Sequence, residues 1–242
     1  MTAQSNTTAY YDATASRYDE MHGEAQNFEH TRALELLLPT YFSNAKSILD
    51  VGSGTGRGLQ WIDTYFREKG ITTELVGVEP SEELSKIARK NLPDAKIIIG
   101  DGERLPFPDS TFDLVMVAGV LHHVENPKKV IKEMFRVSRF GILISDHNNF
   151  SFGSNFSRKI RLALFSMNLL SAFSYVKQGF RKQGYSEGDG WWYPYSVLND
   201  FDMISTLSEH FSIVPTRRAN SNLGNFMISH SHLAIACTKK TL

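Results

Sequence analysis

Three glycines alternate with small residues in the segment ILDVGSGTGRGL (48–59), directly after a short apolar run that contains an acid. A turn without Cβ atoms lets a ligand lie against main-chain amides, and amides at the start of a helix favour polar or anionic groups. Residues 48–51 are typical of a buried strand, and the apolar spacing over 59–66 is typical of an amphipathic helix. The segment therefore predicts a strand-to-helix turn that binds a nucleotide cofactor.

The spacing of the glycines distinguishes between possible cofactors. A dinucleotide fingerprint, GxGxxG, would need a glycine at position 57, where this chain has Arg57, and the lysine of a phosphate-binding P-loop is missing. The glycines are instead Gly52, Gly54 and Gly56, and Asp50 precedes them. A carboxylate beside bare amides suits a ligand with a cationic amine and a carboxylate of its own. A nicotinamide-dependent reductase is therefore disfavoured.

Two more acids follow the next two expected strands. Ligands of open α/β sheets bind at the carboxyl ends of the strands, where Glu79 and Asp101 both fall. Glu79 is placed to accept hydrogen bonds from ribose hydroxyls, and Asp101 could accept one from an adenine amine. The alternative for Glu79 is a solvated acid at the start of a helix, where acids are favoured.

Three histidines follow later strands and could act as a general base. His122 and His123 follow the fourth expected strand, and His147 follows Asp146 at the end of the fifth. Histidine titrates near neutrality and is the commonest general base. Each of the three could instead only hydrogen-bond a loop carbonyl. Because the histidines lack ligand spacing and the chain has one cysteine, no metal site is expected.

These residues must be positioned by strands that alternate with helices. The strands are rich in Val, Ile and Leu without polar alternation, which is typical of a parallel sheet covered by helices on both faces. The fold class expected is α/β, with a doubly wound, Rossmann-like sheet. The strand candidates are residues 47–51, 74–79, 95–100, 112–119, 141–146, 211–217 and 232–240, and the helical windows are 57–69, 81–91, 127–138 and 196–209.

Composition limits the remaining possibilities. The chain has 242 residues, which suits one domain, and 26 basic and 26 acidic residues give no net charge. General affinity for nucleic acid is therefore not expected. The single cysteine, Cys237, cannot form an internal disulfide, and the polar N-terminus does not look like a signal peptide. We expect a soluble cytoplasmic protein.

Four segments together resemble the class I S-adenosylmethionine-dependent methyltransferases of the small-molecule type. They are the glycine turn, VGVEPSEEL (76–84), the stretch that begins GDGERLPF at Gly100, and YYDATASRYDE (10–20). The resemblance implies that the glycine turn holds the methionine part of S-adenosylmethionine, the second-strand acid the ribose and the GD segment the adenine. The cofactor-binding residues so implied are Tyr11, Tyr18, Asp50, Gly52, Gly54, Glu79, Asp101 and Gly102.

The same resemblance implies a single domain with a seven-stranded sheet and a reversed C-terminal strand pair. The PGG turn common in the family before the fifth strand is replaced here by RVSRFGILISD. The divisions expected within residues 1–242 are a helical N-terminal lid (1–45), a cofactor-binding core (46–146), an inserted acceptor-covering segment (147–210) and the final strands (211–242).

The activity implied is methyl transfer to a small-molecule or glycan-precursor acceptor, on oxygen, with His122, His123 and His147 as candidate catalytic residues. A non-catalytic cofactor-binding protein of the same fold is the main alternative. The aromatic run YSEGDGWWYPYS (185–196) could stack on a sugar or aromatic acceptor, with Glu187 and Asp189 holding hydroxyls, or could pack as a lid.

Residues 157–182 have apolar side chains at helical spacing, and no acid occurs between Asp146 and Glu187. The pattern predicts one amphipathic helix of about five turns with basic residues at both ends. Such a helix could cover the acceptor pocket, or it could make peripheral contact with an anionic membrane. The lid is favoured, because serine and asparagine interrupt the polar face.

Overall fold

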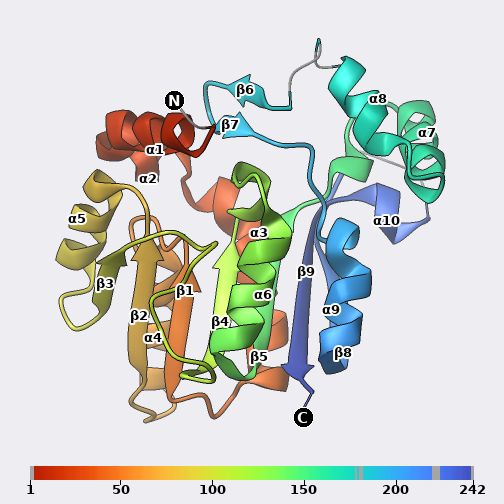
Figure 1. Ribbon diagram of the computed structural model, residues 1–242. Helices are drawn as coiled ribbons and strands as arrows, with labels where there is room; N and C mark the ends of the chain where they lie inside the picture. Colours follow the sequence, from red (N-terminus) through yellow and green to blue (C-terminus); the bar gives the residue numbers. More distant parts are fainter. Residues whose placement is uncertain (1–2, 178, 180–181, 220–223, 241–242) are drawn as a thin grey trace.

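The computed structural model describes residues 3–177, 179, 182–219 and 224–240 (Figure 1). Its main sheet has seven strands in the order β3-β2-β1-β4-β5-β9-β8. The neighbours from β3 to β5 pair in parallel, whereas β9 runs antiparallel to both β5 and β8. This confirms the expected α/β class and the reversed C-terminal pair. The strands are β1 Ser47–Val51, β2 Glu74–Glu79, β3 Lys96–Ile99, β4 Phe112–Ala118, β5 Ser138–His147, β8 Ser208–Arg218 and β9 His230–Lys239.

Helices cover both faces of the sheet, because successive strand residues point to opposite sides. Ile48 of β1 packs with one buried cluster, and its neighbour Leu49 packs with the other. The first cluster includes α3 Glu24–Tyr41, α4 Arg57–Arg67 and α5 Glu82–Asn91. The second includes α6 Pro127–Val137 and α9 Phe201–Leu207, which lie in front of the sheet in Figure 1. The sheet is therefore sandwiched, and only its strand ends remain for a ligand.

The N-terminal helices lie in two different places relative to the sheet. Helices α1 Ala3–Thr14 and α2 Tyr18–Met21, joined by the 3₁₀ turn η1 Ala15–Arg17, lie beyond the carboxyl ends of the parallel strands (Figure 1). Helix α3 instead packs on the sheet against β5, β8 and β9. The part that covers the strand ends is therefore the part before α3.

Between β5 and β8 the chain forms an irregular segment above the sheet (Figure 1). It includes η3 Asn149–Ser151, α7 Asn155–Ser166, α8 Leu170–Lys177, the hairpin of β6 Gly184–Ser186 with β7 Gly190–Trp192, and η4 Val197–Asp200. The helix expected over 196–209 is shorter than predicted, because η4 precedes α9 and Ser208 already begins β8. A short helix, α10 Phe226–Ser229, precedes β9.

The prediction of a single helix over residues 157–182 is wrong. Helix α7 ends at Ser166, and Asn168 has a left-handed backbone with φ of 57°. The amides of Asn168 and Leu169 donate to the carbonyls of Phe165 and Leu164 at 3.0 and 2.8 Å, which is the hydrogen-bond pattern of a Schellman C-cap. Residues 178, 180 and 181 of that range lie outside the described residues. Within the part of the chain that is described, none of the helices has the length and apolar character needed to cross a membrane.

Candidate cofactor and acceptor site

The turn between β1 and α4 requires glycine for two physical reasons. Gly52, Gly54 and Gly56 have φ of 75°, 55° and 87°, the left-handed region that glycine enters without steric cost. A Cβ on Gly52 would also lie 2.5 Å from a methyl of Val120, so the space beside it is already filled. The Gly52 amide donates to the Val78 carbonyl at 2.7 Å, which ties the turn to β2. The turn is thus held in place, and its glycines present main-chain atoms rather than side chains to a ligand.

Two buried carboxylates flank this turn. Asp50 and Glu79 are 4% and 5% exposed. The Glu79 carboxylate accepts hydrogen bonds from the amides of Gly54 and Ser81, both at 2.9 Å. Burial raises the pKa of Glu79 to about 7, and burial together with the Glu79 charge raises that of Asp50 to about 7. A ligand that brings positive charge would therefore be stabilised here.

Two cavities of about 90 Å³ each lie on either side of the turn. Tyr18, Gly52 and Gly54 line both. The first cavity also has Asp50 in its wall, and the second is bounded by Glu79, Leu84, Tyr11 and His123.

Most of the expected cofactor residues come together around these cavities, but two stand apart. Asp101 and Gly102 follow β3 and line neither cavity. The Asp101 carboxylate accepts from the Glu103 amide at 2.8 Å, and Gly102 packs so close to Val51 that a Cβ would lie 2.8 Å from it. Their contact with adenine stays a prediction.

The residues present fit S-adenosylmethionine. The turn excludes side chains, the two carboxylates are buried without an ion pair to any described residue, and Ser53 Oγ is buried with no hydrogen-bond partner among the described residues. This cofactor requires main-chain amides for its polar end, hydrogen-bond acceptors for its hydroxyls and negative charge near its sulfonium.

His122 lies in η2 Leu121–His123, where its ring is held by Asp146. Its Nδ1 donates to Asp146 Oδ1 at 2.6 Å, and Asp146 Oδ2 accepts from the Leu121 amide at 2.7 Å. Its Nε2 faces Asp189 Oδ2 at 3.5 Å. Burial lowers the pKa of His122, but the two carboxylates outweigh burial and raise it to about 10. Burial raises the pKa of Asp146, but the charge and hydrogen bond of His122, together with His147, outweigh it and hold the pKa well below its usual range.

The ring of His123 contacts helix α1 and the β6–β7 hairpin. Its Nδ1 donates to the carbonyl of Trp191 at 2.7 Å, since a carbonyl can only accept. Its Nε2 lies 2.9 Å from the hydroxyl of Tyr11 and 3.5 Å from Asp189 Oδ1. In the neutral ring Nε2 is therefore the acceptor, and His123 lines the same cavity as its partner Tyr11 and as Glu79.

His147 lies between two other histidine rings, which are tilted from it by 59° and 53°. Its ring centroid is 4.1 Å from that of His122 and 4.4 Å from that of His232. Burial, followed by the His122 charge, lowers the pKa of His147 to about 3. His232 belongs to β9, where it is paired with His147, and His30 hydrogen-bonds Ser145 Oγ at 2.8 Å. His30 and His232 were not predicted from the sequence: His232 is brought to the site by the register of β9 on β5, and His30 by the packing of α3 on the sheet.

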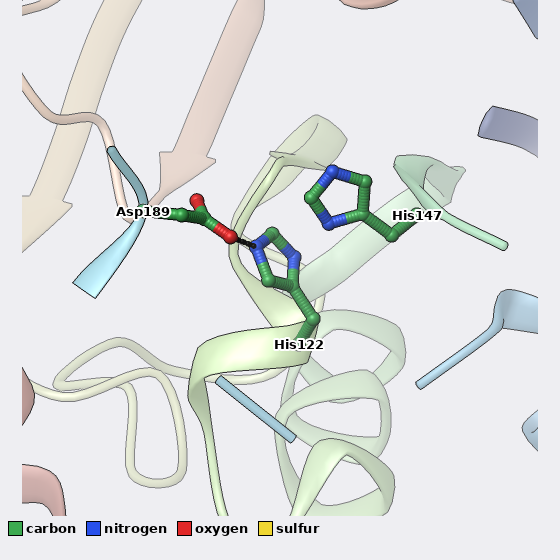
Figure 2. A group of neighbouring side chains, drawn as sticks. All are labelled: His122, His147 and Asp189. Carbon is green, nitrogen blue, oxygen red and sulfur yellow. Dashed lines mark ion pairs between the residues drawn. The ribbon is translucent and has the colours of Figure 1, made fainter. Parts of the chain in front are cut away.

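The aromatic run divides into two parts. Tyr193 lines a cavity of about 630 Å³ between the start of α6, α8 and residues 193–200. Trp191 packs against Tyr185 with ring centroids 5.2 Å apart, and Trp192 packs over Gly184. The two tryptophans thus stabilise the hairpin, which brings Asp189 to the histidines (Figure 2).

Comparison with known proteins points to the same cofactor as the site geometry. Residues 49–144 match the family model for the methyltransferase domain. The chain is 28% identical over 148 residues to a demethylmenaquinone methyltransferase of Renibacterium salmoninarum, with 60% of each chain covered. It is 30% identical over 131 residues to one of Thermotoga maritima, with 52% of this chain and 54% of the relative covered. The chain thus spans somewhat more than half the length of these relatives.

Solved structures share the fold along nearly the whole chain. A S-adenosylmethionine-dependent methyltransferase of Thermotoga maritima has a TM-score of 0.61 at 22% identity and covers 97% of this chain and 100% of its own. The PH0226 protein of Pyrococcus horikoshii has a TM-score of 0.58 at 19% identity and covers 92% and 95%. Residues 49–144 match the methyltransferase domain family, and this match, the methyltransferase relatives and the shared fold together bear out the resemblance to class I S-adenosylmethionine-dependent methyltransferases.

Proposed function

We propose that this protein transfers the methyl group of S-adenosylmethionine to an oxygen atom of a small-molecule acceptor. The observation that carries the proposal is that His123, whose Nε2 is a hydrogen-bond acceptor, lines the same cavity as Gly52, Gly54 and Glu79. A hydrogen-bond acceptor there can take the proton of a hydroxyl while the cofactor lies beside it.

The sulfonium supplies the reactivity, so the protein needs only to bind, orient and exclude water. The amides of the turn bind the polar end of the cofactor, and Asp50 offers negative charge near its amine. Each oxygen of Glu79 already accepts one amide, but a carboxylate has about four lone-pair sites. Glu79 can therefore still accept from ribose hydroxyls.

Of the three candidate bases, His123 fits the role best. The hydroxyl of Tyr11 occupies its Nε2 at 2.9 Å, so an acceptor hydroxyl would take the place of Tyr11. The donor bond from Nδ1 to the Trp191 carbonyl fixes the tautomer that a base requires. His122 Nε2 faces Asp189 instead, and His147 lies among other histidine rings.

The acceptor is proposed to be a small molecule or saccharide that enters beside α8. The cavity of about 630 Å³ there has aromatic walls, Tyr175 and Tyr193, and polar groups such as Asn126 and Asp200. A mixed lining of this kind suits a ring with hydroxyl substituents.

Two measurements test the proposal. Calorimetry is expected to show binding of S-adenosylmethionine and S-adenosylhomocysteine but not of NAD. Release of S-adenosylhomocysteine is then measured with a panel of phenols, quinols, sugars and amines, and turnover is expected with a hydroxyl acceptor. Cofactor binding without turnover on the panel would favour a non-catalytic protein, and turnover on amines alone would overturn methylation of oxygen.

Helices α7 and α8 are proposed to act as a lid over the acceptor rather than as a membrane anchor. Phe165 and Leu170 face the cavity of about 630 Å³. Several other apolar side chains of the segment point to solvent, including Phe156 at 74% and Met167 at 62% exposed, so a peripheral membrane contact is the competing proposal.

Sedimentation with vesicles separates the two. The protein is expected to stay in the supernatant with anionic vesicles at low salt. Pelleting that is lost on addition of salt and in Lys159→Glu with Lys177→Glu would favour the membrane surface. These exposed lysines are suitable positions, whereas Arg158 is buried and its substitution would disturb the fold.

A further inference from the structure

Three potential ligand atoms converge where β4, β5 and the β6–β7 hairpin meet (Figure 2). One ring nitrogen from each of His122 and His147 and one carboxylate oxygen of Asp189 all lie within 4.8 Å of one another. The three residues come from separate segments of the chain, so their spacing along the sequence gives no sign of this arrangement.

A second observation concerns His122 alone. Its side chain is 4% exposed, and its buried Nε2 makes no hydrogen bond within the described residues beyond the 3.5 Å approach of Asp189 Oδ2. The other ring nitrogen donates to Asp146 at 2.6 Å, and Asp146 is fixed in turn by the Leu121 amide. A carboxylate that holds one nitrogen of a histidine while the other faces the site is the usual support of a metal-binding histidine.

We propose that His122, His147 and Asp189 bind a divalent transition-metal ion of the zinc type. Two imidazoles and one carboxylate are ligands that Zn²⁺ accepts, and three protein ligands leave a fourth position open. Binding would release the Nε2 proton of His122 to solvent, because only a deprotonated ring nitrogen can bind the ion. No comparison with known proteins assigns such a site to this chain.

The distances are compatible with such an ion after small movements. Ligand atoms around tetrahedral zinc are roughly 3.4 Å apart, given bonds of about 2.1 Å. His122 Nε2 and Asp189 Oδ2 are already 3.5 Å apart. The wider separations, up to 4.8 Å, have to close by up to about 1.4 Å. These wider separations involve His147, because His122 and Asp189 are already close, and the His147 ring is only partly buried.

The site also lies beside the proposed base. Asp189 reaches His122 with one oxygen and His123 Nε2 with the other, both at 3.5 Å. An ion bound to Asp189 would therefore hold an acceptor oxygen at its open position close to His123. This last role rests on the proposed function, whereas binding of the ion does not.

The test is direct metal binding to the full chain after chelator treatment. Co²⁺ is titrated and followed by its visible absorption, and Zn²⁺ is titrated by calorimetry. Wild-type protein is expected to bind one equivalent of each. Asp189→Asn and His147→Ala are expected to weaken binding tenfold or more. His210→Ala, at an exposed histidine on β8, is the matched control and should bind like wild type.

Thermal melts of each variant check folding, and Asp189→Asn keeps the size of the side chain. Wild-type protein that binds neither ion, or binding unchanged in both ligand variants, would overturn the proposal. Loss of binding in His210→Ala would overturn it as well. S-adenosylmethionine affinity measured on the metal-free samples reports separately on the proposed function, so either can fail without the other.

Discussion

The two sides of the site are held together in different ways. On the cofactor side, main-chain groups do most of the work: the Gly52 amide binds the Val78 carbonyl, and the Gly54 amide binds Glu79. On the acceptor side, side chains hold one another, as in the bonds from His122 to Asp146 and from Tyr11 to His123. A turn held by main-chain hydrogen bonds keeps its shape when a distant side chain is replaced, whereas a side-chain network can lose its function at a single position. Substitutions on the two sides should therefore affect different measurements.

The largest effect is expected from His123→Ala. Turnover should fall by ~10² or more, because the group that takes the acceptor proton is lost. S-adenosylmethionine affinity should stay close to that of wild type, since the turn and both acids are intact. The measurement is S-adenosylhomocysteine release with an acceptor found in the panel, with His210→Ala as control. If His122→Ala, His123→Ala and His147→Ala all keep near-normal rates, catalysis by positioning alone is the better account.

On the cofactor side, Glu79→Ala should raise the Kd for S-adenosylmethionine about 10- to 100-fold. The reason is loss of hydrogen bonds to a charged group, worth ~1.5 to 3 kcal/mol in total. The melting temperature without ligand should change little, because loss of the two amide bonds is offset by removal of a carboxylate whose charge is disfavoured by burial. Glu82→Ala, at an exposed acid in the first turn of α5, is the matched control for calorimetry. Equal affinity in the two variants would remove Glu79 from the site.

The same difference explains which parts of the site could be predicted from the sequence. Gly52, Gly54 and Glu79 are each adjacent to a strand end, so strand periodicity alone places them at one edge of the sheet. The association of Asp189 with His122 depends on a hairpin of three-residue strands that carries no periodic signal. The pairing of His147 with His232 requires the register of β5 and β9. Residues brought together only by tertiary contacts could not be predicted without the fold.

A smaller effect is expected from pH. Burial raises the pKa of both Asp50 and Glu79 to about 7, and the cation of the cofactor favours their ionised forms. Affinity should therefore increase from pH 6 to pH 8 and then level off, by at most ~10-fold per pH unit for each group. Asp50→Asn should flatten part of this slope in calorimetric titrations, and an unchanged slope would contradict the assignment.

Without cofactor, the free energy of unfolding is expected to change with pH in the direction opposite to the cofactor affinity. A raised pKa means that the folded state binds more protons than the unfolded chain between about pH 4 and pH 7. The free energy of unfolding should decrease as pH rises through that range, and the contribution is lost above the folded pKa of about 7. Denaturant titrations of wild-type protein and Asp50→Asn measure the difference, and a contribution that grows with pH would contradict the raised pKa.

The break between α7 and α8 had a local signal in the sequence, Asn168, but the apolar spacing around that residue favoured one continuous helix. The apolar spacing over 157–182 continues through Asn168, so periodicity alone predicts one helix. Asparagine is second only to glycine at the left-handed position that ends a helix. The turn directs α8 along the cavity of about 630 Å³, so one residue decides how the acceptor side is covered.

The smallest effect is expected at Asn168. Its φ of 57° is tolerated by asparagine and glycine, but a Cβ-bearing residue without a local hydrogen bond costs roughly 1 kcal/mol there. Asn168→Ala should therefore lower the melting temperature by about 2 to 4 °C, as expected for a chain of this size. Asn168→Gly should melt close to wild type, because glycine adopts this conformation freely. Since Asn168 lines the acceptor cavity and neither cofactor cavity, Asn168→Ala should change the KM for the acceptor and leave the Kd for S-adenosylmethionine unaltered. A cofactor Kd that shifts as much as the acceptor KM would mean that the two sides are coupled through α7 and α8, and that the division between them does not hold.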